Sequence, residues 1–163
     1  MRRIITALLV TFVAMGAAGA GEELSLVDRY RVGNWALYRI MGEDDLRQRH
    51  SIVAVEGEGD DAVVTLRVVS LFRDEEKGSN DFRITMRQLR EDDDNTSADV
   101  VRTEKVILKG KEYDAEVVER MFNGKKHVTA SSKALPVNGT IRVQVIGTPP
   151  LSELMDFGFG EEK

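Results

Sequence analysis

The sequence predicts a mainly β protein: an antiparallel meander of about nine strands forming a curved sheet, a half-barrel or a barrel, with little helix. Beyond residue 20, apolar residues recur with a period of two rather than 3.6. Short polar or glycine-containing turns separate the apolar runs, and no segment offers a helix long enough for a parallel crossover. Because helices are too scarce to cover the sheet, we expect it to bury its apolar face by curling. A two-sheet sandwich is the main alternative.

The first 20 residues have the pattern of a signal peptide. Arg2 and Arg3 precede an uncharged apolar run from Ile4 to Met15, and Ala18-Gly19-Ala20 follows with small residues. The run is shorter than the roughly 20 residues that span a bilayer, although a retained anchor helix is the alternative. We therefore expect a signal peptide at 1–20 and a single β-rich domain at 21–163. The expected location is exported, periplasmic or secreted, with no transmembrane span after cleavage.

The first four strands are predicted from branched and aromatic runs. Glycines bracket Trp35–Ile40, and a polar glycine-rich turn at 56–61 closes Ile52–Val55. Ala62–Phe72 is rich in valine and leucine. Phe82–Met86 alternates apolar residues with arginine and threonine, which is typical of a strand with one face in water.

Five further strands are predicted in the second half of the chain. Val100–Leu108 alternates, and the Lys109-Gly110 turn leads into Tyr113–Phe122. Asn123-Gly124 is the strongest hairpin signal, because both residues tolerate a positive φ. The remaining predicted strands are His127–Ala130, Ile141–Ile146 and Leu154–Phe157.

Little of the chain favours helix. A short helix is expected over Glu22–Tyr30, where the apolar residues make only a weak stripe. The charge runs Arg73–Lys77 and Arg90–Asp94 are interpreted as solvated loops.

Composition excludes several classes of protein. The 163-residue chain contains no cysteine, which excludes disulfides, thiolate zinc sites, iron–sulfur clusters and cysteine nucleophiles. Its net charge of -5 argues against a nucleic-acid partner, since lysine and arginine must neutralise phosphates. We expect no cofactor.

One acidic segment is a weak calcium candidate. Oxygen-bearing side chains stand at positions one, three, five, seven and twelve of a loop, the spacing that suits Ca²⁺. They are Asp93, Asn95, Ser97, Asp99 and Glu104. Position six is Ala98 rather than glycine and the flanks alternate as strands, so a hydrophilic hairpin loop is the alternative.

Nothing in the sequence assembles a catalytic site. The two histidines, His50 and His127, are expected to face water. Ser51, Ser131 and Ser132 are available, but none lies in a G-x-S-x-G motif. We therefore expect a protein that is not an enzyme, with a hydrolase of unrecognised site as the least favoured interpretation.

Three stretches resemble a pattern of secreted bacterial proteins. Val32–Arg39 resembles a "VGxWxxYR" strand and Val106–Val117 resembles a hairpin around "GKxYxxxV". Ser131–Arg142, followed by Leu154–Gly158, is similar to an "SxxxPVxGx[IV][KR] … Lxx[FY]G" ending. That family consists of uncharacterised secreted β-rich proteins whose sheet resembles the LolA/LolB-type lipoprotein carriers. The resemblance implies a half-barrel fold and an export compartment, and it brings no catalytic residue. This chain has Thr129-Ala130 where members often carry an aromatic.

The third stretch also has an interpretation from its own residues. Pro136 fixes φ and disfavours helix at Leu135, and Asn138-Gly139 then turns the chain. These features indicate a structural corner.

Two functional hypotheses remain. A curved sheet has a concave face that can bind an apolar or amphiphilic ligand, although the same residues also make a filled core, which is the favoured interpretation. Alternatively, the protein is an interaction module for another envelope protein, using a strand edge or the Phe157-Gly158-Phe159 tail.

Overall fold

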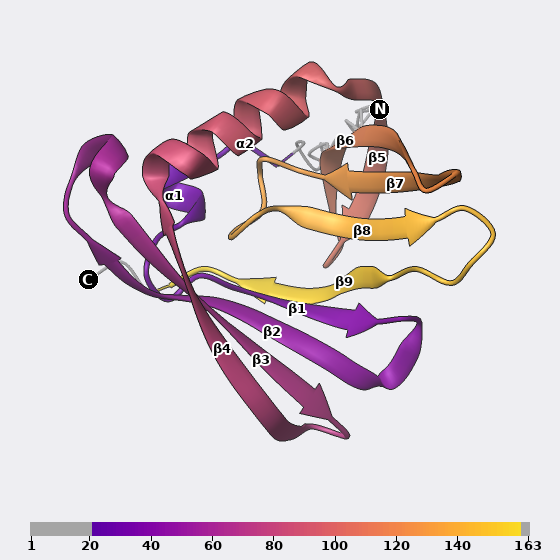
Figure 1. Ribbon diagram of the computed structural model, residues 1–163, viewed down its shortest axis with the longest axis horizontal. Helices are drawn as coiled ribbons and strands as arrows, with labels where there is room; N and C mark the ends of the chain where they lie inside the picture. The colour runs from indigo at the N-terminus through magenta and orange to yellow at the C-terminus, as the bar shows by residue number, and fades with distance from the viewer. Residues whose placement is uncertain (1–20, 161–163) are drawn as a thin grey trace, which may run out of the picture.

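A computed structural model describes residues 21–160 as one nine-stranded antiparallel sheet with two α-helices (Figure 1). The predicted signal peptide at 1–20 lies outside the described residues. The elements are α1 (Leu26–Arg29), β1 (Trp35–Ile40), β2 (Glu43–Glu56), the 3-10 helix η1 (Gly59–Asp61), β3 (Val63–Phe72), β4 (Glu75–Thr85), α2 (Met86–Ala98), β5 (Val100–Leu108), β6 (Lys111–Phe122), β7 (Lys125–Ser131), β8 (Thr140–Val145) and β9 (Ser152–Gly158).

The sheet is curved and does not close. Its strand order is β4-β3-β2-β1-β9-β8-β7-β6-β5, and every neighbouring pair is antiparallel. Strands β4 and β5 are therefore its two free edges, and the ribbon curls from one to the other (Figure 1). The predicted curved antiparallel sheet is confirmed, and it is neither a closed barrel nor a two-sheet sandwich.

The strand order departs from a simple meander at one point. Within β1–β4 and within β5–β9 each strand pairs with its successor, but the two halves join through β1 and β9. Ala36 lies opposite Phe157 and Tyr38 opposite Leu154, with a bulge between Leu37 and Tyr38. The first and last strands thus lie together in the middle of the sheet, and α2 carries the chain from one edge to the other (Figure 1).

Two strands extend further into charged sequence than predicted. β2 begins at Glu43 and β4 at Glu75, so the interpretation of Arg73–Lys77 as a solvated loop is wrong for its second half. Arg67 and Asp81 lie opposite each other in the β3–β4 ladder and form an ion pair at 2.7 Å. Arg47 of β2 pairs at 2.7 Å with Asp74 in the β3–β4 turn. Cross-strand pairs of this kind let a strand form without an apolar run.

Helix α2 corrects a second expectation. The sequence predicts a strand ending at Met86 and a solvated loop at Arg90–Asp94, but both lie in this helix. Thr85 Oγ1 accepts a hydrogen bond from the Gln88 backbone N–H at 3.2 Å, and Gln88 Oε1 accepts one from the Thr85 N–H at 3.1 Å. This reciprocal capping box starts a helix whose buried residues are Met86 and Leu89.

Helix α1 is shorter than the Glu22–Tyr30 segment expected to be helical. It covers Leu26–Arg29, with Ser25 as its N-cap. Its last residue, Arg29, is only 5% exposed and donates to Asp93 of α2 at 2.7 Å. The charged contact therefore ties the two helices together.

One core cluster joins both helices to the sheet. It includes residues of β1–β3, both helical segments and the second half of the sheet. Its members include Tyr30, Ala36, Tyr38, Ile52, Val64, Met86, Leu89, Tyr113, Val117, Val128, Leu135, Leu154 and Phe157. These buried side chains support the filled-core interpretation of the curved sheet.

The segment between β7 and β8 forms the predicted corner. Ser132 N donates to Gly139 O at 2.9 Å, and Val137 N donates to Arg29 O at 2.8 Å. Val137 is fully buried although its φ is +59°, a conformation that costs a β-branched residue free energy. Tyr38 Oη donates to Asn138 Oδ1 at 3.0 Å, which fastens the corner to the centre of the sheet.

Candidate functional site

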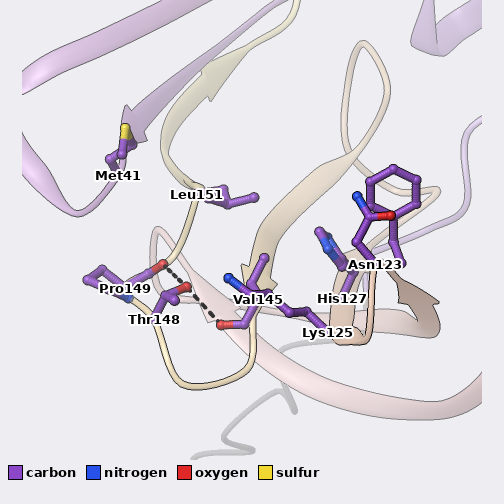
Figure 2. A pocket seen from close by; sticks show the side chains of 9 residues that line it. Met41, Asn123, Lys125, His127, Val145, Thr148, Pro149 and Leu151 are labelled. Atoms are coloured by element: carbon purple, nitrogen blue, oxygen red, sulfur yellow. Dashed lines mark hydrogen bonds between the residues drawn. The ribbon is translucent and has the colours of Figure 1, made fainter.

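An apolar pocket lies at one end of the sheet, where β1, β6 and β8 finish and β7 and β9 begin (Figure 2). We call it the strand-end pocket. Its volume is about 440 Å³. It is lined by Met41, Phe122, Asn123, Lys125, His127, Val145, Thr148, Pro149 and Leu151. This volume falls within the range of small-molecule sites.

Three turns build the pocket. Asn123 and Gly124 both have positive φ, as the predicted hairpin requires, and this turn places Phe122 and Lys125 at the rim. Met41 also has a positive φ, of 53°, and its backbone N–H donates to Leu151 O at 2.9 Å. That bond holds the β1–β2 turn against the β8–β9 loop.

The apolar lining is open to water. Met41 is 60% exposed, Phe122 64% and Leu151 39%, whereas Val145 beneath them is buried. These exposed apolar side chains gather around one hollow, whereas exposed apolar side chains that are scattered singly need no explanation.

The polar groups of the pocket come mostly from the β6–β7 hairpin. Asn123, Lys125 and His127 lie on one side, and Met41, Pro149 and Leu151 lie on the other (Figure 2). Thr148 Oγ1 is engaged with the carbonyl oxygens of Val145 at 2.9 Å and Pro149 at 3.2 Å. The pocket therefore has an apolar side and a side that carries hydrogen-bond donors.

A second apolar pocket lies beside α1 and the start of α2. Its volume is about 430 Å³, and its lining includes Val27, Val32, Val55 and Met86. Its charged lining residues include Glu58 and Arg90, and Arg90 pairs with Asp60 at 2.9 Å. Because cationic and anionic residues both line it, this pocket selects less clearly for one kind of ligand.

The calcium candidates do not form a common site. Asp93, Asn95 and Ser97 lie on α2, Asp99 caps that helix, and Glu104 lies on β5. Their oxygens are engaged elsewhere: Asp93 with Arg29, Ser97 with Lys133, Asp99 with Arg120 and Glu104 with Arg102. Within residues 21–160, no three histidine or acidic side chains gather around a common point. The hydrophilic hairpin alternative is also wrong, because Asp93–Ala98 ends helix α2 and Val100–Glu104 begins strand β5.

Both histidines are less exposed than expected. The His50 ring lies 4.9 Å from the Tyr38 ring, and its Nδ1 is buried with no hydrogen-bond partner in the described part of the chain. His127 packs edge-on against Phe122, with 5.8 Å between ring centroids. In residues 21–160 neither ring is hydrogen-bonded to a serine, so a Ser–His pair is not assembled.

The position of His50 makes folding sensitive to acid. Burial lowers the pKa of its imidazole below the ordinary value of 6.5. The unfolded chain therefore binds this proton more readily than the folded protein, and stability is lost as the pH falls below about 6.5. We expect urea unfolding at a series of pH values to show a smaller acid-induced loss of stability in His50→Gln than in the native protein. Equal acid-induced losses of stability in His50→Gln and in the native protein would contradict the role of His50.

The C-terminal tail divides into a buried and an exposed part. Phe157 is 6% exposed and packs edge-on against Tyr113, with 6.0 Å between ring centroids. Phe159 is 51% exposed, and Gly160 N donates to Asn34 Oδ1 at 2.9 Å. The hypothesis of an interacting tail therefore applies only to Phe159, because Phe157 belongs to the core.

Comparisons with protein-family models, with curated proteins and with solved structures found no match for this chain. The resemblance to LolA/LolB-type carriers therefore stays a prediction. Within the described residues, neither helix has the length and apolarity needed to cross a bilayer.

Proposed function

We propose that this protein is a non-enzymatic binding protein of an export compartment, and that it holds an apolar or amphiphilic ligand in the strand-end pocket. The observation that carries the proposal is the pocket's division into an apolar side and a donor-bearing side. The export compartment rests on the signal-peptide pattern of residues 1–20. The proposed site is at the end of the sheet, because buried side chains occupy the core that a concave-face ligand would need.

The pocket suits a single alkyl chain. Burial of each methylene contributes about 0.8 kcal/mol, and association must first offset a cost of at least about 4 kcal/mol. An alkyl chain of medium length buries enough methylenes to exceed this cost of association, and it still fits a cavity of about 440 Å³. A flat aromatic ligand would make less use of the flexible Met41 and Leu151 side chains.

Titration with an apolar fluorescent dye, followed by displacement with decanoate, tests the proposal. The double variant Met41→Asn with Phe122→Gln removes two exposed walls, and asparagine tolerates the positive φ at position 41. We expect the variant to bind both probes about tenfold more weakly, since it loses apolar contact area.

The control variant is Ile107→Gln. Ile107 is 73% exposed on β5 and does not line the pocket. We expect its affinity for the dye and for decanoate to match that of the native protein. Undetectable binding by the native protein, or equal weakening in both variants, would overturn the proposal.

A further inference from the structure

The charge on the strand-end pocket has one sign. Of its lining residues only Lys125 is a lysine or arginine, and none is an aspartate or glutamate. The chain as a whole carries a net charge of -5, so this local cation runs against the overall balance.

Lys125 differs from the other lysines of residues 21–160. Lys77, Lys105, Lys109, Lys126 and Lys133 each form an ion pair with a carboxylate, and Lys111 lies over the Tyr113 ring. Within the same residues Lys125 has neither kind of partner. An ammonium group beside an apolar hollow, with no acidic neighbour lining it, attracts an anion.

The neighbours of Lys125 add donors on the same side. The Asn123 carboxamide and the His127 imidazole carry N–H groups, whereas the Thr148 hydroxyl already contacts two carbonyl oxygens. Met41, Pro149 and Leu151 lie across the hollow (Figure 2). An anionic head beside Lys125 therefore leaves its alkyl chain facing apolar side chains.

We propose that the strand-end pocket selects single-chain amphiphiles with an anionic head, and that Lys125 binds the head. The inference rests on the proposed function, because it specifies the ligand of the same pocket. A carboxylate and a phosphate monoester share the required chemistry, since both accept hydrogen bonds from an ammonium group.

The test compares four ligands of equal chain length by calorimetric titration below their micelle concentrations. They are decanoate, decyl phosphate, decanol and decyltrimethylammonium. We expect both anions to bind the native protein more tightly than decanol, and decanol more tightly than the cation. Added salt should weaken the anions only, because it screens an exposed charge pair.

The matched variants are Lys125→Gln and Lys111→Gln. Lys111 begins β6 at the end opposite Phe122, so its substitution makes the same charge change away from the pocket. We expect Lys125→Gln to weaken the anions about three- to fivefold, leave decanol unchanged, and bring the ligands to similar affinities. We expect Lys111→Gln to behave as the native protein.

The outcomes separate the two proposals. Equal affinity for decanol and the anions in the native protein would overturn the anionic preference and leave a general apolar pocket. Equal weakening of the anions by both lysine substitutions would overturn the role of Lys125. Failure of all four ligands to bind would overturn the proposed function itself. If only decanoate or only decyl phosphate binds more tightly than decanol, the anionic preference holds and that head group identifies the natural ligand class.

Discussion

Gly139→Ala is expected to destabilise the protein by at least about 3 kcal/mol. Gly139 has a φ of +66°, which strains any residue with a Cβ. The added methyl would also stand inside van der Waals contact with the Ser132 carbonyl oxygen, a backbone atom that cannot rotate away. Chemical denaturation followed by circular dichroism measures the loss.

Gly110→Ala is the control for backbone strain alone. Gly110 has a φ of +74°, but a Cβ there would meet open space. We expect it to cost about 1–2 kcal/mol. Equal losses of stability in Gly139→Ala and Gly110→Ala would contradict the close contact between Gly139 and the Ser132 carbonyl oxygen.

Phe157→Ala is expected to cost about 3–5 kcal/mol of stability. Its ring contacts Tyr113, and its backbone pairs with Ala36 at the junction of the two halves of the sheet. Truncation leaves a cavity where β9 joins the first half of the sheet to the second. Thermal and urea unfolding both report the change.

The adjacent aromatic provides a matched control. Phe159 is 51% exposed, and Phe159→Ala should change stability by less than about 1 kcal/mol. Similar losses in both variants would contradict the placement of Phe157 in the core and Phe159 at the surface.

The fold class could be predicted because its signals are local. The two-residue period, the turn at Asn123-Gly124 and the corner at Asn138-Gly139 each follow from neighbouring residues. The union of β1 with β9 could not be predicted in the same way. It depends on contacts between residues more than a hundred positions apart, such as Ala36 and Phe157.

Helix α2 was missed because its sequence is dominated by polar residues. Only Met86 and Leu89 are buried, and the helix has neither an acidic residue in its first turn nor a basic residue in its last turn to complement its dipole. The one local signal was Thr85 followed three residues later by Gln88, a capping box pattern. Tertiary ion pairs, including Arg29 with Asp93, stabilise what propensity alone does not predict.

The strand-end pocket was also beyond sequence reasoning. The sequence predicts that His127 faces water, and no local pattern indicates that Met41 or Leu151 lines a pocket. The pocket exists because three separate turns meet at one end of the sheet, and their meeting is set by the strand order. A lysine next to a hairpin turn is common in sequence, and only the fold shows that Lys125 has no ion-pair partner among residues 21–160.

Methyl NMR during titration with decanoate tests the central claim most directly. Saturable shifts are expected at the methyl groups of Met41, Val145 and Leu151, with Ile107 unaffected. Shifts confined to Val27, Val32 and Val55 would place the ligand in the pocket beside α1. That result, or no saturable shift at all, would contradict the assignment of the binding site to the strand-end pocket.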